Sequence, residues 1–111
     1  MKNTPSQLLD HLIAIFPEFY SEWSKGESHR YSEQYSYHSV FQEFAPVSYR
    51  ILNRATPNQI QEFCELINHM VDIGGELENA ISTCFLEHAS QIGVSKIIKP
   101  FLSKEAKKEL R

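Results

Sequence analysis

Apolar residues recur at helical spacing over most of the chain, and no stretch of five residues alternates strictly between apolar and polar as a half-buried strand would. Two capping signals match each other, Thr4-Pro5-Ser6-Gln7 and Thr56-Pro57-Asn58-Gln59. In each, Thr is the N-cap, Pro takes the first helical position, and Gln three residues after Thr can complete a capping box. They predict one helix that runs to about Phe16 and another from Pro57 to Ile73, which Gly74 and Gly75 end.

The region between these two helices is less regular. Pro17 is expected to start a short helix that carries Phe19 and Trp23 and ends at Gly26. Residues 27–54 keep roughly helical spacing, but Pro46 falls in the middle of the apolar pattern. This pattern predicts either two consecutive helices or one helix kinked at Pro46.

The last third of the chain predicts a helix from Glu76 to about Ser90, with Cys84, Phe85 and His88 on its main apolar face and Leu86 away from them. A short apolar piece broken by Pro100 follows, and Ser103 is expected to cap a basic terminal helix. We therefore predict an all-α fold, in which residues 1–111 form a single compact bundle of five to seven short helices without a sheet. The predicted core contains Leu12, Phe16, Trp23, Phe41, Phe44, Ile60, Phe63, Ile67, Ile81, Cys84 and Phe85.

Composition narrows the class of protein. The chain has 111 residues, of which 41% are hydrophobic and 23% charged, as is typical of one globular domain. Its longest unbroken apolar run, Leu12 to Phe16, is far shorter than the roughly 20 residues that span a bilayer. We expect a cytoplasmic protein, monomeric before it binds a partner and not associated with membranes.

Charge is distributed unevenly along the chain. Residues 55–95 carry six acidic residues and no Lys or Arg, whereas residues 96–111 carry six basic residues and two acidic ones. An acidic middle argues against nucleic-acid binding, because Lys and Arg supply most of the affinity for phosphates. It favours a basic protein partner.

Candidate chemistry is sparse. Cys64 and Cys84 lack the paired short spacings of a zinc site, and His69 with Asp72 offers only two metal ligands on one helical face. Cys84 and His88 are four residues apart on one face, but both lie on its apolar stripe, which favours a buried thiol without function. We therefore expect no catalytic residue, no metal site and no cofactor, and a protein that is not an enzyme.

Two segments resemble a known family. Phe16-Pro17-Glu18-Phe19 followed by Trp23, and the segment from Glu78 to Glu87, are similar to a family of uncharacterised small bacterial all-α proteins. That family includes immunity proteins of contact-dependent growth inhibition systems. The resemblance implies a protein that binds the toxic C-terminal domain of an exported toxin, a basic nuclease with RNase favoured, and occludes its active site.

The family motifs mark no binding residues, so the expected partner-binding surface comes from charge alone. It comprises Glu62, Glu65, Asp72, Glu76 and Glu78. These acids could instead solvate the helix or pair with Lys104, Lys107 or Lys108. The alternative function is a non-catalytic helical interaction module, such as a secretion chaperone or adaptor. An enzyme that uses distant residues such as His38, Glu43 and His69 is a further alternative.

Overall fold

The computed structural model describes residues 4–25 and 35–110, and in these ranges every regular element is helical. The prediction of an all-α fold is confirmed. Among the described residues, no helix combines the length and the apolar character needed to cross a membrane. The elements are α1 (Pro5–Ile15), α2 (Phe19–Lys25), α3 (Tyr37–Arg54), α4 (Pro57–Ile73), α5 (Gly75–Cys84), the 3-10 turn η1 (Leu86–His88), α6 (Ala89–Ile92), α7 (Ser95–Ile98), the 3-10 turn η2 (Lys99–Phe101) and α8 (Lys104–Glu109).

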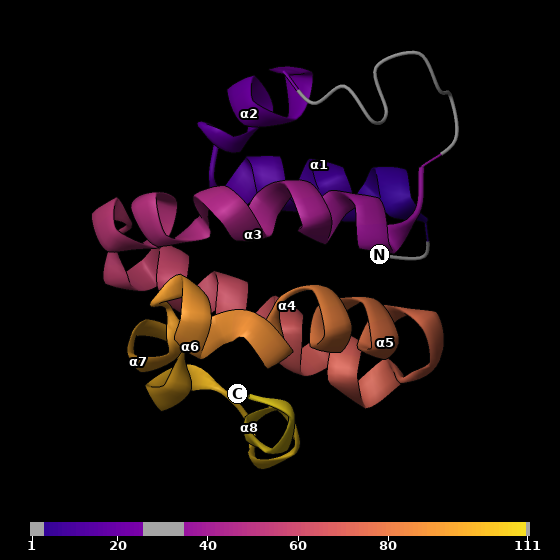
Figure 1. Ribbon diagram of the computed structural model, residues 1–111, viewed down its shortest axis with the longest axis vertical. Helices are drawn as coiled ribbons and strands as arrows, with labels where there is room; N and C mark the ends of the chain where they lie inside the picture. Colours follow the sequence, from indigo (N-terminus) through magenta and orange to yellow (C-terminus); the bar gives the residue numbers. More distant parts are fainter. Residues whose placement is uncertain (1–3, 26–34, 111) are drawn as a thin grey trace.

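The helices are arranged around α4, which contacts α1, α5, α7, η2 and α8. In Figure 1, α1 and α3 lie above α4 and α5, while α2 and α8 lie towards opposite ends of the long axis. α3 packs against α1, α2 and α5. α4 is thus the central element of the described fold.

Local capping fixes where α1 and α4 begin. The Thr4 hydroxyl accepts a hydrogen bond from the Gln7 backbone N–H at 3.1 Å. At α4 both halves of the predicted capping box form: Thr56 Oγ1 accepts from Gln59 N–H, and Gln59 Oε1 accepts from Thr56 N–H at 2.8 Å. Gln59 Nε2 also donates to the Ile15 carbonyl at 2.9 Å, which joins the start of α4 to the end of α1.

α3 runs through Pro46 as one helix from Tyr37 to Arg54, so the alternative of two helices with Pro46 at the break is wrong. Its N-cap is Ser36, and the expected stop of the preceding helix, Gly26, lies outside the described residues. Ser48 is the buried polar side chain of the core. Its hydroxyl donates to the Ala45 carbonyl at 2.7 Å, so no polar group is left unsatisfied there.

The prediction of one helix over residues 76–90 is wrong in its second half, because the helix is interrupted at Phe85. α5 ends at Cys84, and Phe85 has φ −134° and ψ −62°. This turn buries both Phe85 and Leu86 completely, which a continuous helix could not do from one face. It also places His88 at the surface, where its Nδ1 lies 3.3 Å from Gln91 Oε1, rather than on an apolar face.

Four phenylalanines from separate elements meet at the centre. Phe16, Phe44, Phe63 and Phe85 are fully buried, and their ring centroids lie 5.3 to 6.0 Å apart in the contacting pairs. Aromatic pairs at this spacing add stability beyond the area that they bury. Of the eleven predicted core residues, eight are buried, and the three that are only partly buried against the core are Trp23, Ile60 and Cys84.

Trp23 of α2 belongs to a second, smaller group of aromatic side chains. Its ring centroid lies 5.0 Å from that of Tyr35 and 6.3 Å from that of Phe19. α2 is also joined to α3 by the ion pair between Glu22 and Arg50, whose N···O distance is 2.6 Å.

The C-terminal segment is attached to α4 through Asn68. Its Nδ2 donates to the Phe101 carbonyl at 3.3 Å, and its Oδ1 accepts from the Ser103 N–H at 2.8 Å. Ser103 then caps α8 as predicted, since its hydroxyl accepts from the Ala106 N–H. One amide side chain therefore fixes the chain reversal between η2 and α8.

Candidate functional site

The exposed side of α4 carries the acids that the charge pattern singles out. Glu62, Glu65 and Asp72 are exposed, and His69 is half-buried. The opposite side of the helix is buried and includes Phe63, Cys64, Ile67 and Met70. Since α4 is the central helix of the fold, its exposed side is held in place by the packing of its buried side.

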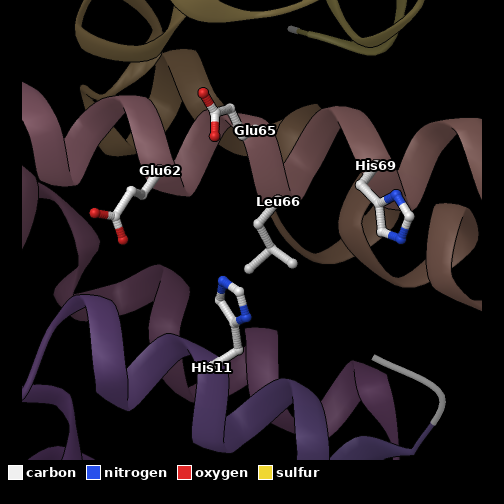
Figure 2. A pocket seen from close by; sticks show the side chains of 5 residues that line it. All are labelled: His11, Glu62, Glu65, Leu66 and His69. Carbon is white, nitrogen blue, oxygen red and sulfur yellow. The ribbon is translucent and has the colours of Figure 1, made fainter. Parts of the chain in front are cut away.

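A hollow of about 270 Å³ lies between this side of α4 and α1. Glu62, Glu65, Leu66 and His69 line it from α4, and His11 lines it from α1. Figure 2 shows His11 directed at α4 opposite Leu66, with Glu62 and His69 to either side. Glu62, His69 and His11 therefore lie around one apolar side chain, whereas the Glu65 carboxylate is directed away from it and accepts a hydrogen bond from Gln61 Nε2 at 3.3 Å. We call this space the α1–α4 hollow.

The residue types of the α1–α4 hollow are those that bind metals, but their arrangement does not suit an ion. Within the part of the chain that the structure describes, no group of three or more His, Cys, Asp or Glu side chains could hold a metal ion. None of Glu62, Glu65, Asp72, Glu76 and Glu78 forms an ion pair with a described Lys or Arg.

Glu76 and Glu78 lie on α5 rather than beside the α1–α4 hollow. Glu76 is exposed and lines a second hollow, of about 300 Å³, together with Ile73 and Tyr37. Glu78 is half-buried and faces Glu109 of α8. Thus the structure brings Glu62 and Glu65 together in one hollow, whereas Glu76 and Glu78 lie in two other settings.

Glu109 has a perturbed carboxyl group. Partial burial raises its pKa, and the hydrogen bond to Glu78 and the negative charges of Glu78 and Glu87 raise it further, against a hydrogen bond with Ser82 that lowers it. α8 therefore presents a carboxyl group, not a lysine, to Glu78. The acidic surface therefore gains one carboxyl group from α8, that of Glu109.

The two cysteines differ sharply in their surroundings. Cys64 is fully buried, and its Sγ donates to the Ile98 carbonyl at 3.6 Å. Burial, with a smaller contribution from the Glu65 charge, raises the pKa of the Cys64 thiol to about 12. Cys84 is half-buried at the end of α5, and its Sγ lies 3.1 Å from Nδ1 of His38.

Two of these groupings could not be found from spacing in the sequence. His11 reaches the α1–α4 hollow only because α1 packs on α4, and His38 is 46 residues from Cys84. The spacing of four residues instead pointed to His88, which lies at the surface beside Gln91. His38 contacts Cys84 while His69 lines the α1–α4 hollow, so these two histidines belong to different sites.

Of three comparisons with known proteins, only the one with protein families finds a match. A comparison with curated proteins finds no match, and neither does a comparison with solved structures. The match to a family covers residues 9–111, which is nearly the whole of the chain and includes both hollows and both cysteines. The chain therefore belongs to the family described as a domain of unknown function, DUF7674.

Proposed function

We propose that this protein is an immunity protein of a contact-dependent growth inhibition system. It binds the toxic C-terminal domain of the exported toxin in the cytoplasm and occludes the toxin's active site. The toxin domain is basic, and an RNase is the favoured activity. The resemblance of the Phe16-Pro17-Glu18-Phe19 and Glu78–Glu87 segments to such proteins motivates this function.

The observation that carries the proposal is an acidic surface that no Lys or Arg of the described residues compensates. Residues 55–95 contain six acids and no Lys or Arg, and the five acids from Glu62 to Glu78 form no ion pair with a described Lys or Arg. The alternative in which Lys104, Lys107 or Lys108 neutralises them finds no such pair among the described residues. Four of the five, all but Glu78, are exposed and thus available to a cationic partner.

The α1–α4 hollow suits a Lys or Arg side chain of the toxin. Such a side chain can lie along the hollow, over the buried Leu66, while its charged end pairs with Glu62 or Glu65. Farther along α4, Ile73 is 47% exposed beside the second hollow and offers an apolar contact. Long-range attraction speeds encounter, and burial of these contacts slows dissociation.

The test measures association between this protein and the toxic C-terminal domain encoded by its neighbouring gene, at two ionic strengths. Changing Glu62 and Glu65 together to Lys should slow association several-fold and weaken its dependence on salt. The melting temperature should barely move, because both side chains are exposed. Co-expression should protect cells against the toxin domain with the wild-type chain and less well with the variant.

The matched control changes Glu18 and Glu105 to Lys, since both are exposed and the net charge changes by the same amount. Equal slowing by the control would mean that only net charge matters and would remove the α1–α4 hollow from the interface. Binding of the toxin domain without protection of the cells would contradict the immunity function and favour a chaperone or adaptor.

A further inference from the structure

His38, Asn79 and Cys84 form a polar cluster outside the acidic surface. His38 lies in the first turn of α3, and Asn79 and Cys84 lie on α5, which packs against α3. Nδ1 of His38 is 3.1 Å from Cys84 Sγ, and Nε2 of the same ring is 3.4 Å from Asn79 Nδ2. One imidazole therefore joins a thiol to an amide.

A thiol beside an imidazole whose other ring nitrogen meets an amide is an arrangement that activates a nucleophile. A thiol reacts as thiolate, and a base within hydrogen-bond distance can remove its proton as it attacks. A third group that holds the other ring nitrogen fixes the tautomer of the base. A half-turn of the Asn79 amide places Oδ1 against Nε2–H, and this leaves Nδ1 of His38 free to accept the Cys84 proton.

The site is accessible to a small reagent. Cys84 and His38 are both half-buried, and Asn79 and Thr83 beside them are exposed. The Thr83 hydroxyl lies 3.8 Å from Cys84 Sγ and donates to the Asn79 carbonyl at 2.7 Å, so the surroundings of the sulfur are polar. Cys64 has none of these features.

We propose that His38, Asn79 and Cys84 form a reactive-thiol site at which Cys84 is modified by thiol–disulfide exchange with a small disulfide. The site is independent of the acidic surface and of the proposed immunity function.

The disulfide reagent itself supplies the oxidation that the exchange requires. The Cys84 proton passes to Nδ1 of His38 while Sγ attacks one sulfur of the reagent. The S–S bond of the reagent breaks, a bond forms between Cys84 Sγ and the attacked sulfur, and the departing thiolate takes the proton from His38. Cys84 is oxidised to a mixed disulfide and the departing half is reduced to a thiol, so no further oxidant is needed.

The first measurement uses the wild-type chain and oxidised glutathione near neutral pH, with the adduct located by peptide mass spectrometry. The adduct should form on Cys84 and not on Cys64. With iodoacetamide, Cys84 should react about tenfold faster in the native chain than in the chain unfolded in urea. A free thiol, as in the unfolded chain, is only a few per cent thiolate at this pH, whereas in the native chain His38 can take the proton as the sulfur attacks. A native rate equal to or below the unfolded rate would overturn the proposal.

Variants then separate the base from the packing. H38N keeps a polar atom near the sulfur but removes the base, and it should abolish most of the rate advantage. N79A should reduce it partly. H88N is the matched control, since His88 is four residues from Cys84 but exposed, and it should leave the rate unchanged.

Cys64 reports whether each variant stays folded, because it reacts only when the core opens. An unchanged Cys84 rate in H38N with Cys64 still protected would overturn the proposal, as would equal slowing by H88N. If H38N exposes Cys64, the decision rests on the wild-type comparison and on N79A, whose exposed side chain can be removed without opening the core.

Discussion

The two sides of α4 differ in what they contact and in what a change to them should do. One side packs Phe63, Ile67 and Met70 into the core, where other residues surround every atom. The other side presents Glu62 and Glu65 to solvent without a described Lys or Arg partner. Because one rigid helix carries both, stability and recognition can be altered separately.

Phe63→Ala should cause the largest loss of stability. Its ring is fully buried against Phe16, Phe44 and Phe85, and truncation removes apolar contacts and leaves a cavity. The free energy of unfolding should fall by about 3–5 kcal/mol, measured by denaturant titration. Phe101→Ala is the control, because Phe101 is 39% exposed. An equal loss of stability in both variants would mean that the buried side of α4 contributes no more to the free energy of unfolding than an exposed aromatic side chain does.

Asn68→Ala tests the boundary between the two sides. It removes two hydrogen bonds, to the Phe101 carbonyl and from the Ser103 N–H, and leaves these backbone groups without that partner. We expect a loss of about 1–3 kcal/mol in the free energy of unfolding. Asn58→Ala, on the exposed first turn of the same helix, should change it far less. Faster hydrogen exchange in α8 of the Asn68 variant would locate the effect at the C-terminal attachment.

Thr56→Ala tests the start of α4, on which both sides depend. The variant loses the hydroxyl that accepts from Gln59 N–H, and a lost N-cap of this kind costs about 1 kcal/mol. Thr56→Ser keeps the hydroxyl and should retain most of the stability in the same thermal unfolding experiment. If both variants unfold at the wild-type temperature, the capping box is not what fixes this end of the helix.

Glu109→Gln should give the smallest effect, and its sign depends on pH. The pKa of Glu109 is raised in the folded chain above its ordinary value of 4.5, so its carboxyl favours the fold below that value. This contribution is lost as pH rises through the raised pKa, and at neutral pH the ionised group opposes folding. The variant should therefore melt slightly higher than wild type at neutral pH.

Below the ordinary pKa of Glu109 the difference between the variant and wild type should vanish. Glu105→Gln removes the same charge from an exposed position on α8 and should not reproduce this pH dependence. A variant that melts lower than wild type at neutral pH would show that the Glu109 carboxylate is favourable there.

The sequence predicted those elements whose determinants are local. The Thr56 capping box, Pro57 and Gly74 set the bounds of α4, and both bounds are as predicted. The break at Phe85 was missed because it depends on a ring packing against Phe44 and Phe63, which come from other helices. A helical pattern continues through residue 85, so spacing alone could not reveal it.

The same limit applies to the sites. The exposure of Glu62 and Glu65 follows from the period of α4, and the structure places both at the surface. The contributions of His11 and His38 follow from how α1 packs on α4 and α3 on α5, which no local pattern encodes. The spacing of residues in the sequence therefore identified the residues of each site that lie on one helix, but not the histidine that a second helix contributes.

Trp23 gives the protein a built-in optical probe, since it is the single tryptophan of the chain. Its ring lies against Tyr35 and Phe19, and Phe19 joins this group to the four-phenylalanine centre through Phe44, at a centroid distance of 5.1 Å. Its fluorescence will report on the packing of α2, whereas far-ultraviolet circular dichroism reports on all helices together. Coincidence of the two unfolding curves would show that α2 melts with the rest, and an earlier fluorescence change would reveal a separate cooperative unit.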